Sequence, residues 1–138
     1  MTDPLRFTVD ITPQAAQQIG DQAGPILRAM AAGVVGEMKR LMSLPKSGRA
    51  YRRGRRAIHV ASAPGEAPAI DTGNLAGSIN FGMQSPTMAE VTVNAEYAAY
   101  LEFGTIRMAA RPYVEPALEK VRDQFRGILG QARINRPI

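Results

Sequence analysis

An apolar stripe between two prolines constrains the fold of this chain more than any other feature of its sequence. Large apolar side chains recur there at steps of three and four residues, at Leu27, Met30, Val34, Met38 and Leu41. That spacing is typical of one buried face of an α-helix. We predict that this helix runs to about residue 43 and ends because the next residue precedes Pro45, and a residue before proline avoids helical backbone angles.

The beginning of this helix is expected further upstream. Thr12 followed by Pro13 has the chemistry of a helix N-cap and a first helical position. Gly20 and the pair Gly24-Pro25 weaken the helix near its beginning and are expected to kink it. Just before the cap, residues 7–11 alternate apolar and polar side chains, which predicts a short strand.

The second half of the chain is predicted to contain a strand pair and two helices. Residues 75–83 and 89–95 are expected to form the two strands, with a turn between them. A helix of two turns over residues 97–103 ends at a glycine. After a loop, Pro112 can open a last helix with an apolar stripe that continues to about residue 129.

These elements predict an α+β fold with a long N-terminal helix, a small antiparallel sheet, an extended basic arm and a C-terminal helix. At 138 residues the chain has room for one domain, which we expect to span residues 1–138. The arm is expected to project at about residues 45–70, and residues 131–138 to form a flexible tail. The 13 glycines and 10 prolines indicate long loops around a modest core.

The positive charge of the chain is concentrated in one segment. Residues 39–56 contain eight of the 17 basic residues and no acidic one, whereas the rest holds nine basic against twelve acidic residues. This segment is expected to include a hairpin, with its sides at 49–51 and 57–60 and its tip at 52–56. The candidate contacts to DNA phosphates or to an acidic partner are Arg49, Arg52, Arg53, Arg55 and Arg56. Only Tyr51 is interleaved, so a base-stacking surface is poorly supported, and a solvated loop is the alternative.

Several classes of chemistry find no support in the sequence. The chain has no cysteine, which excludes disulfides and thiolate catalysis. No apolar run approaches the roughly 20 residues of a membrane span, and the N-terminal residues do not resemble a signal peptide, so we expect a protein made and used in a cytoplasm. His59 is the single histidine and has no cysteine or carboxylate pair nearby, so no metal, catalytic dyad or cofactor is expected.

Asp71-Thr72-Gly73 matches the catalytic turn of aspartic proteases, in which two such turns present paired carboxylates to one water. A homodimeric protease would need a single copy. Two features argue against this interpretation. Pro-Ala-Ile precedes Asp71 instead of a long apolar strand, and residues 112–129 are predicted to be helical where that fold needs strands. We therefore expect Asp71 to cap a turn or a helix, and the protein not to be an enzyme.

Two further stretches indicate fixed backbone geometry with a few anchoring side chains. Residues 63–70 contain Pro64, Gly65 and Pro68 and are predicted to form a stiff extended connector. Residues 97–105 carry three aromatic side chains and lead into a segment that begins at Arg111. Glu102 is either an ordinary helix-end residue or the partner of Arg107 or Arg111 in a salt bridge, within one subunit or between subunits. Rigid turns and aromatic anchors favour a protein that is assembled into something larger.

In this arrangement the chain resembles the small neck or tail-completion proteins of long-tailed phages, the gene-product-ten-like family of lambdoid phages. The resemblance covers about half of the chain. It rests on Gly48–Tyr51, Ala63–Pro68, Asp71–Leu75 with Ser78-Ile79, Tyr97–Thr105 and Arg111–Ala117, in that order. The chain departs from the family pattern at Ala67, where a second proline is common, and at Ile106-Arg107.

The resemblance implies a structural virion protein at the head–tail junction that joins the capsid connector to the tail without catalysis. It implies assembly in the bacterial cytoplasm into or onto a six-fold ring of copies, beside other neck and tail proteins and near the passing genomic DNA, with no membrane involved. The residues then expected at subunit interfaces are Pro64, Gly65, Glu66, Pro68, Asp71, Thr72, Gly73, Leu75, Tyr97, Tyr100, Glu102, Phe103, Arg111 and Pro112.

Overall fold

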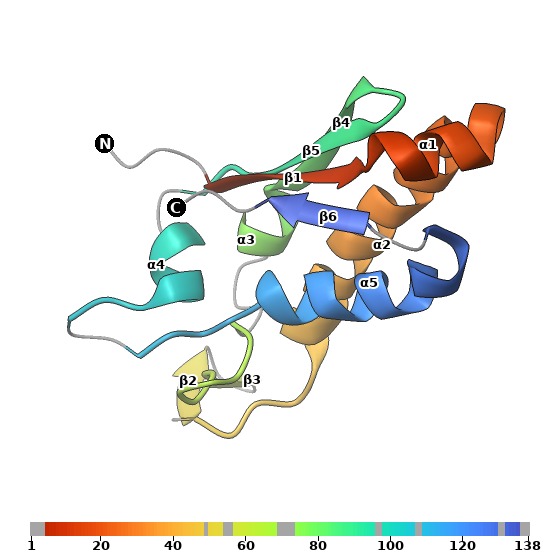
Figure 1. Cartoon of the computed structure of the whole chain (residues 1–138). Coiled ribbons are helices and arrows are strands. Elements are labelled where there is room, and N and C mark those ends of the chain that lie inside the picture. The colour runs from red at the N-terminus through yellow and green to blue at the C-terminus, as the bar shows by residue number, and fades with distance from the viewer. Residues whose placement is uncertain are drawn as a thin grey trace.

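The computed structural model describes residues 5–48, 50–53, 57–68, 74–95, 98–106, 109–129 and 132–135 (Figure 1). The N-terminal half contains β1 (Leu5–Ile11), α1 (Pro13–Ile19), a 3-10 turn η1 (Gly20–Gln22), α2 (Ala23–Ser43), β2 (Ala50–Arg53) and β3 (Ala57–Val60). The second half contains α3 (Asn74–Gly77), β4 (Ile79–Ser85), β5 (Met88–Val93), α4 (Ala98–Phe103), α5 (Glu115–Leu129) and β6 (Ala132–Asn135). The predicted α+β class is confirmed.

The first strand of the chain lies in the interior of the main sheet. The strand order is β4-β5-β1-β6, and each neighbouring pair is antiparallel. Phe7 in β1 is paired with Val91 in β5, and Val9 is paired with Ile134 in β6. The residues of β6 were expected to belong to a flexible tail, but the structure pairs them with β1. The other two strands, β2 and β3, form a separate two-stranded sheet.

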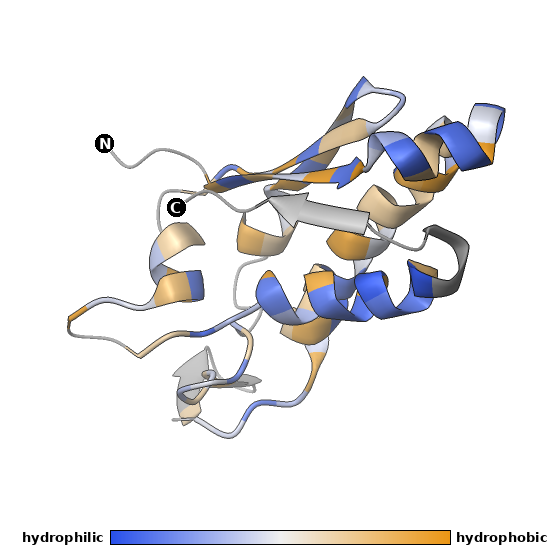
Figure 2. Ribbon diagram, viewed as in Figure 1, coloured by the Kyte–Doolittle hydropathy of each residue, from blue (hydrophilic) through white to orange (hydrophobic). Residues whose placement is uncertain are grey.

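The core lies between one face of the main sheet and the helices α2 and α5 (Figure 1). Leu27, Met30, Val34 and Met38 are fully buried, as the apolar stripe predicts. At the end of the stripe the buried residue is Met42, and Leu41 is half-buried. Figure 2 shows mostly apolar residues along α2 and mostly hydrophilic residues along α5. Only Ala117, Leu118 and Val121 of the described side chains of α5 are buried, so α5 covers the core with one face.

The predicted helix start is confirmed, and the predicted kink has a specific location. Thr12 caps α1 by accepting a hydrogen bond at Oγ1 from the N–H of Ala15 at 3.2 Å, with Pro13 at the start of the helix. Gly20 has a φ of 69°, in the left-handed region, and separates α1 from α2. Pro25 does not break α2, because it lies in the first turn, where a backbone N–H has no partner within the helix.

Two predicted boundaries were wrong. Residues 75–78 were expected to start a strand, but the chain forms the helical turn α3 there and the strand begins at Ile79. The carbonyl of Leu75 accepts hydrogen bonds from the N–H of Ser78 at 3.1 Å and from its hydroxyl at 2.7 Å, which closes this turn. The last helix begins at Glu115 and not at Pro112.

Candidate assembly surface

Two motifs that are far apart in the sequence lie side by side in the structure. The N–H of Gly65 donates a hydrogen bond to the carbonyl of Ala110 at 3.0 Å. The Nε of Arg111 donates to the hydroxyl of Ser62 at 3.1 Å. The proline-rich segment before residue 68 and the segment around Arg111 therefore form one structural unit. No sequence pattern predicts this contact, because Ser62 and Arg111 are separated by 49 residues.

The predicted stiff extended connector contains a tight turn at its start. The N–H of Glu66 donates to the carbonyl of Ala63 at 3.0 Å, and Gly65 has a φ of 87°. Proline followed by a glycine with positive φ is typical of a type II turn. The prediction of an extended conformation was wrong here, because the Pro-Gly pair reverses the chain. Pro64 and Gly65 are exposed at this turn, while Pro68 is buried.

The carboxylate of Glu66 joins the two ends of the segment that carries the β2–β3 hairpin. Its Oε1 accepts hydrogen bonds from the N–H of Ala63 at 2.6 Å and of Ser47 at 3.1 Å, and its Oε2 accepts the Ser47 hydroxyl at 2.9 Å. The hydrogen bonds from Ala63 and Ser47 lower the pKa of Glu66 below its usual 4.5. The N–H of Gly48 also donates to the carbonyl of Ala61 at 2.9 Å. The base of the hairpin is thus closed by a charged side chain and a backbone bond.

Acid is expected to open the hairpin base. Because the pKa of Glu66 is lowered in the folded state, its contribution is fully present above 4.5, the value of the free group, and is lost as the pH falls through the lower folded value. The protection of the Ser47 and Ala63 amide protons, relative to the exchange of an unfolded chain at the same pH, should therefore fall below that pH. Nuclear magnetic resonance of the Glu66→Gln variant should show the same loss of protection, and hence faster exchange than in the parent, at neutral pH. Equal exchange in both proteins at all pH values would contradict the role given to Glu66.

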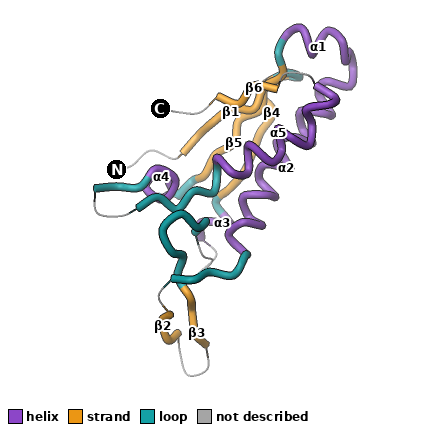
Figure 3. Tube along the Cα trace, turned by 60° about the horizontal axis from the view of Figure 1, so that its bottom comes forward, coloured by secondary structure: helices purple, strands orange, loops and turns teal. Residues whose placement is uncertain are grey.

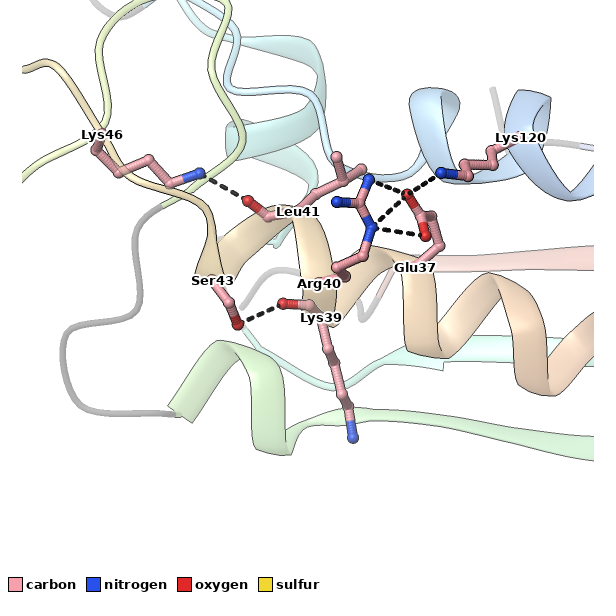
Figure 4. Close-up of polar contacts among 7 residues, drawn as sticks. All are labelled: Glu37, Lys39, Arg40, Leu41, Ser43, Lys46 and Lys120. Carbon is pink, nitrogen blue, oxygen red and sulfur yellow. Dashed lines mark hydrogen bonds and ion pairs between the residues drawn. The ribbon is translucent and has the colours of Figure 1, made fainter.

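The chain that leaves α2 toward the hairpin is also anchored (Figure 4). The Nζ of Lys46 donates to the carbonyl of Leu41 at 2.7 Å, and burial lowers the pKa of Lys46. One turn earlier, the Nε of Arg40 donates to the Glu37 carboxylate at 2.9 Å, and Lys120 of α5 lies 3.9 Å from the same carboxylate. Arg40 and Lys46, two cations of the basic segment, therefore bind groups of the protein itself.

Glu102 in α4 is buried and accepts three backbone hydrogen bonds at the start of α5. Its Oε1 accepts from the N–H of Tyr113 at 2.8 Å and of Val114 at 2.7 Å, and its Oε2 accepts from the N–H of Glu115 at 3.2 Å. These amides are the groups that a helix leaves without internal partners, and a negative charge there also interacts favourably with the helix dipole. Glu102 is therefore a helix cap supplied from another helix, which explains why α5 begins at Glu115.

Neither of the two interpretations of Glu102 drawn from the sequence anticipated this role. Arg111 directs its guanidinium to Ser62 and, through Nη1, to the carbonyl of Ala109 at 2.8 Å. The predicted pairing of Arg111 with Glu102 is not found. The alternative partner, Arg107, lies outside the described residues.

Residues 104–106 and 109–112 are two loop segments that leave and return to α4, and we call these two segments the arch. At its start, Gly104 has a φ of 77° and its N–H donates to the carbonyl of Tyr100 at 2.8 Å. At its other end, the N–H of Arg111 donates to the carbonyl of Leu101 at 2.6 Å. Figure 1 shows the arch projecting from the body beside α4. The arch is thus attached to α4 at both of its ends.

Three large apolar side chains on α4 and the arch are exposed to solvent. Tyr100 is 47% exposed, Phe103 is 54% exposed and Ile106 at the arch is fully exposed. By contrast, Tyr113 is buried and its hydroxyl donates to the carbonyl of Ala98 at 2.9 Å. The sequence indicated Tyr100 and Phe103 as anchors, but it missed Ile106 as an exposed apolar residue and Tyr113 as a core residue. We call Tyr100 and Phe103, which lie three residues apart on α4 and therefore on one side of it, the apolar patch.

The other residues predicted to act in assembly or DNA contact are buried, partly described, or outside the described part of the chain. Leu75 is buried in the core and Pro112 is half-buried. Arg52 and Arg53 lie in β2, but the positions of their side chains are not described. The predicted residues that lie outside the described part of the chain are Arg49, Arg55, Arg56, Asp71, Thr72, Gly73 and Tyr97.

In the described ranges, no group of three or more histidine or acidic side chains is arranged to hold a metal ion. Within the same ranges, no helix combines the length and the apolar character needed to cross a membrane. What the described geometry does provide is a fixed scaffold that displays apolar side chains, as expected of a component built into a larger assembly.

Comparison with known families agrees with this class. Residues 13–104, two thirds of the chain, match the family described as "Bacteriophage HK97-gp10, putative tail-component". The chain belongs to this family of phage tail components. The matched range includes α2, the hairpin, the Pro64-Gly65 turn and α4, but it ends before most of the arch. No curated protein and no solved structure matches the chain.

Proposed function

We propose that this protein is a structural component of the phage head–tail junction, where it assembles into or onto a ring and joins the capsid connector to the tail. Its family of phage tail components supports a place in the virion. Its partners would be copies of itself, in a six-fold ring, and the neighbouring neck and tail proteins. The proposal includes no catalytic step and no cofactor.

The observation that carries this proposal is the apolar patch on a fixed scaffold. Covering the exposed parts of Tyr100 and Phe103 would remove roughly 200 Å² of apolar surface from water, which contributes about 5 kcal/mol before the costs of association. Glu102 and Arg111 hold the backbone beneath the patch, so little conformational entropy is lost when a partner binds. Aromatic side chains in such positions dominate the binding energy of protein interfaces.

Electron microscopy of particles made without this gene tests the proposed position. We expect filled heads and finished tails that remain separate. Tails that fail to form, or heads that fail to fill, would place the protein at another step and contradict the proposal.

Replacing the aromatic residues of the patch should abolish joining without unfolding the protein. For the Tyr100→Ser/Phe103→Ser double variant we expect unfolding free energy within about 1 kcal/mol of the parent, because both side chains lie at the surface. Joining of heads to tails in a complementation assay should fall at least tenfold. The matched control is Leu44→Ser, which removes an apolar side chain of similar exposure, 41%, from the end of α2. Normal joining by the double variant would contradict the role of the patch.

A second candidate is a DNA-binding protein that uses the basic hairpin, since residues 39–56 contain eight basic residues and no acid. Such a protein should bind DNA with an affinity that falls steeply as salt is raised. Serine at Arg49, Arg52, Arg53, Arg55 and Arg56 should abolish that affinity. A junction protein should bind DNA only weakly when it is free, and the joining of heads to tails should require the protein. Tight, salt-dependent DNA binding together with normal joining in particles that lack the gene would favour the second candidate.

The absence of catalysis is tested at Asp71. The Asp71→Asn variant should join heads to tails as efficiently as the parent, whereas a protease would lose its activity. The helix α5 occupies residues 115–129, in the region where an aspartic protease needs strands.

A further inference from the structure

The strand β4 forms an edge of the main sheet and has little of the protection that sheet edges usually carry. In the described part of the chain, β4 is paired with β5 on one side only. Its seven residues, Ile79–Ser85, include no charged side chain and no proline. Exposed edges in proteins are normally blunted by charges, prolines or bulges. Here the only irregularity is a register shift between Met83 and Ser85, next to the turn.

A gap in the side chains of β4 leaves an acidic residue of β5 accessible from this edge. Gly82 is paired with Glu90, and a Cβ added at Gly82 would meet no atom within 4 Å. Glu90 lies on the face of the sheet opposite α2, since its neighbours Ala89 and Val91 are buried in the core. Its carboxylate accepts a long hydrogen bond from the Thr92 hydroxyl at 3.5 Å. None of the salt bridges among described residues involves Glu90.

The hairpin of β2 and β3 has free strand edges and basic residues, which complement the free edge of β4 and the acidic Glu90. It is a two-stranded sheet of four paired residues on each strand, separate from the main sheet. A hairpin of this size is marginally stable by itself, and each strand has one side without a strand partner in the described structure. Strand β2 contains Arg52 and Arg53 within the segment that has no acidic residue.

We propose that β2 of one copy pairs with the free edge of β4 in a neighbouring copy, so that an arginine of β2 reaches across Gly82 to Glu90. This inference rests on the self-association included in the proposed function. An added strand would lie about 4.8 Å from β4 and roughly 10 Å from β5. Because adjacent residues of a strand alternate between faces, either Arg52 or Arg53 shares the face of Glu90 in any register. The missing side chain at Gly82 leaves the path between the two charges open.

The pairing is between copies and not within one copy. Figures 1 and 3 both show the hairpin beyond the end of the main sheet and not alongside β4. The two surfaces are different, so the contact is heterologous and each copy can bind one neighbour through β2 and another through β4. Such contacts generate closed rings or open chains, whereas pairing of β4 with itself would stop at a dimer.

Engineered cysteines test the pairing directly, because the natural chain has none. The Gly82→Cys/Arg52→Cys variant treated with a short bismaleimide should give a ladder of covalent dimers, trimers and larger species. A mixture of the two single variants should give dimers that contain one copy of each. The control is Gly36→Cys/Arg52→Cys, which places one cysteine on an exposed position of α2 and should give no ladder.

Charge reversal tests the contact with Glu90. Glu90→Lys should weaken self-association, measured by light scattering over a dilution series, at least tenfold. Adding Arg52→Glu and Arg53→Glu to that variant should restore most of the loss. Glu119→Lys, on an exposed face of α5, is the control and should leave association unchanged.

Failure of this inference is distinguishable from failure of the proposed function. Covalent dimers from Gly82→Cys alone would show that β4 pairs with itself and would overturn the inference. Oligomers without a ladder would also overturn it, while leaving a ring intact. A protein that is monomeric at all concentrations yet still required for joining would refute the β2–β4 pairing and leave the junction role standing. A monomer that is dispensable for joining would refute both.

Discussion

Replacing Glu102 by alanine is expected to lower the free energy of unfolding by about 3 kcal/mol, because three backbone amides lose a charged partner in a buried site. The carboxylate accepts hydrogen bonds from the N–H groups of Tyr113, Val114 and Glu115. Glu102 is only 7% exposed, so water is a poor substitute for the lost carboxylate. Urea denaturation monitored by circular dichroism measures this loss. The first turn of α5 should fray, so the amide of Val114 should exchange much faster in the variant.

Two further variants distinguish the loss of the helix cap from the loss of a negative charge elsewhere on the protein. Glu102→Gln keeps one acceptor oxygen but places an amino group opposite one of the amides, so we expect about half of the loss seen with alanine. Glu119→Ala removes an exposed carboxylate from α5 and should change the stability by less than about 0.5 kcal/mol. A Glu102→Ala variant as stable as the Glu119→Ala control would show that the cap contributes little.

The second large effect is expected at Gly48. A Cβ at this position would collide with the carbonyl oxygen of Ala61 and would lie 2.7 Å from that of Ser62. Both are backbone atoms, so the hairpin strands would have to separate at their base and the bond from the Gly48 N–H to Ala61 would break. We expect Gly48→Ala to raise the rate of limited proteolysis within residues 49–62 at least tenfold, which corresponds to about 1.4 kcal/mol of local stability.

Gly36 provides a matched control with the opposite expected sign. It lies in α2, where an added Cβ would meet no atom within 4 Å. Gly36→Ala should therefore stabilise the protein by up to about 1 kcal/mol, because alanine is the better helix former. An unchanged cleavage rate of the hairpin in Gly48→Ala would show that the backbone at its base moves apart to accommodate the Cβ without loss of local stability.

Short-range sequence patterns predicted the helices and strands that are stabilised by contacts between residues close together in the chain. The stripe from Leu27 to Met38 defines α2 because every residue of the stripe faces the same core, and Thr12-Pro13 defines the start of α1 through contacts within four residues. Gly104 ends α4 with a positive φ, which its neighbours in sequence already suggest. In each case the stabilising contacts lie within one or two helical turns.

The boundaries that were wrong depend on contacts between distant residues. The start of α5 is displaced from Pro112 to Glu115 because Glu102 occupies the amides between them. The strand order also could not be read from the sequence, since the pairing of Phe7 with Val91 joins segments that are remote along the chain. The short turn α3 was missed because four residues are too few for a helical period to appear.

Candidate site residues were named from the sequence, but their arrangement was not predicted. Tyr100, Phe103 and Arg111 were identified because aromatic and guanidinium groups are typical of interfaces. Glu66 and Glu102 were also named as candidates, yet both accept hydrogen bonds from backbone amides of their own chain. No sequence pattern distinguishes such a carboxylate from one that forms a salt bridge with a partner. Ser47 and Ser62 gave no signal at all, since single serines occur at most surface positions.

The interior position of β1 has a consequence for how the protein is made. Strand β1 cannot pair until its partners β5 and β6 have been synthesised, so the helices α1 and α2 emerge from the ribosome long before the sheet that covers them exists. During that interval the stripe from Leu27 to Met42 is exposed to solvent. Nascent chains stalled before residue 88 should therefore bind chaperones, and release should follow only when β5 closes over β1.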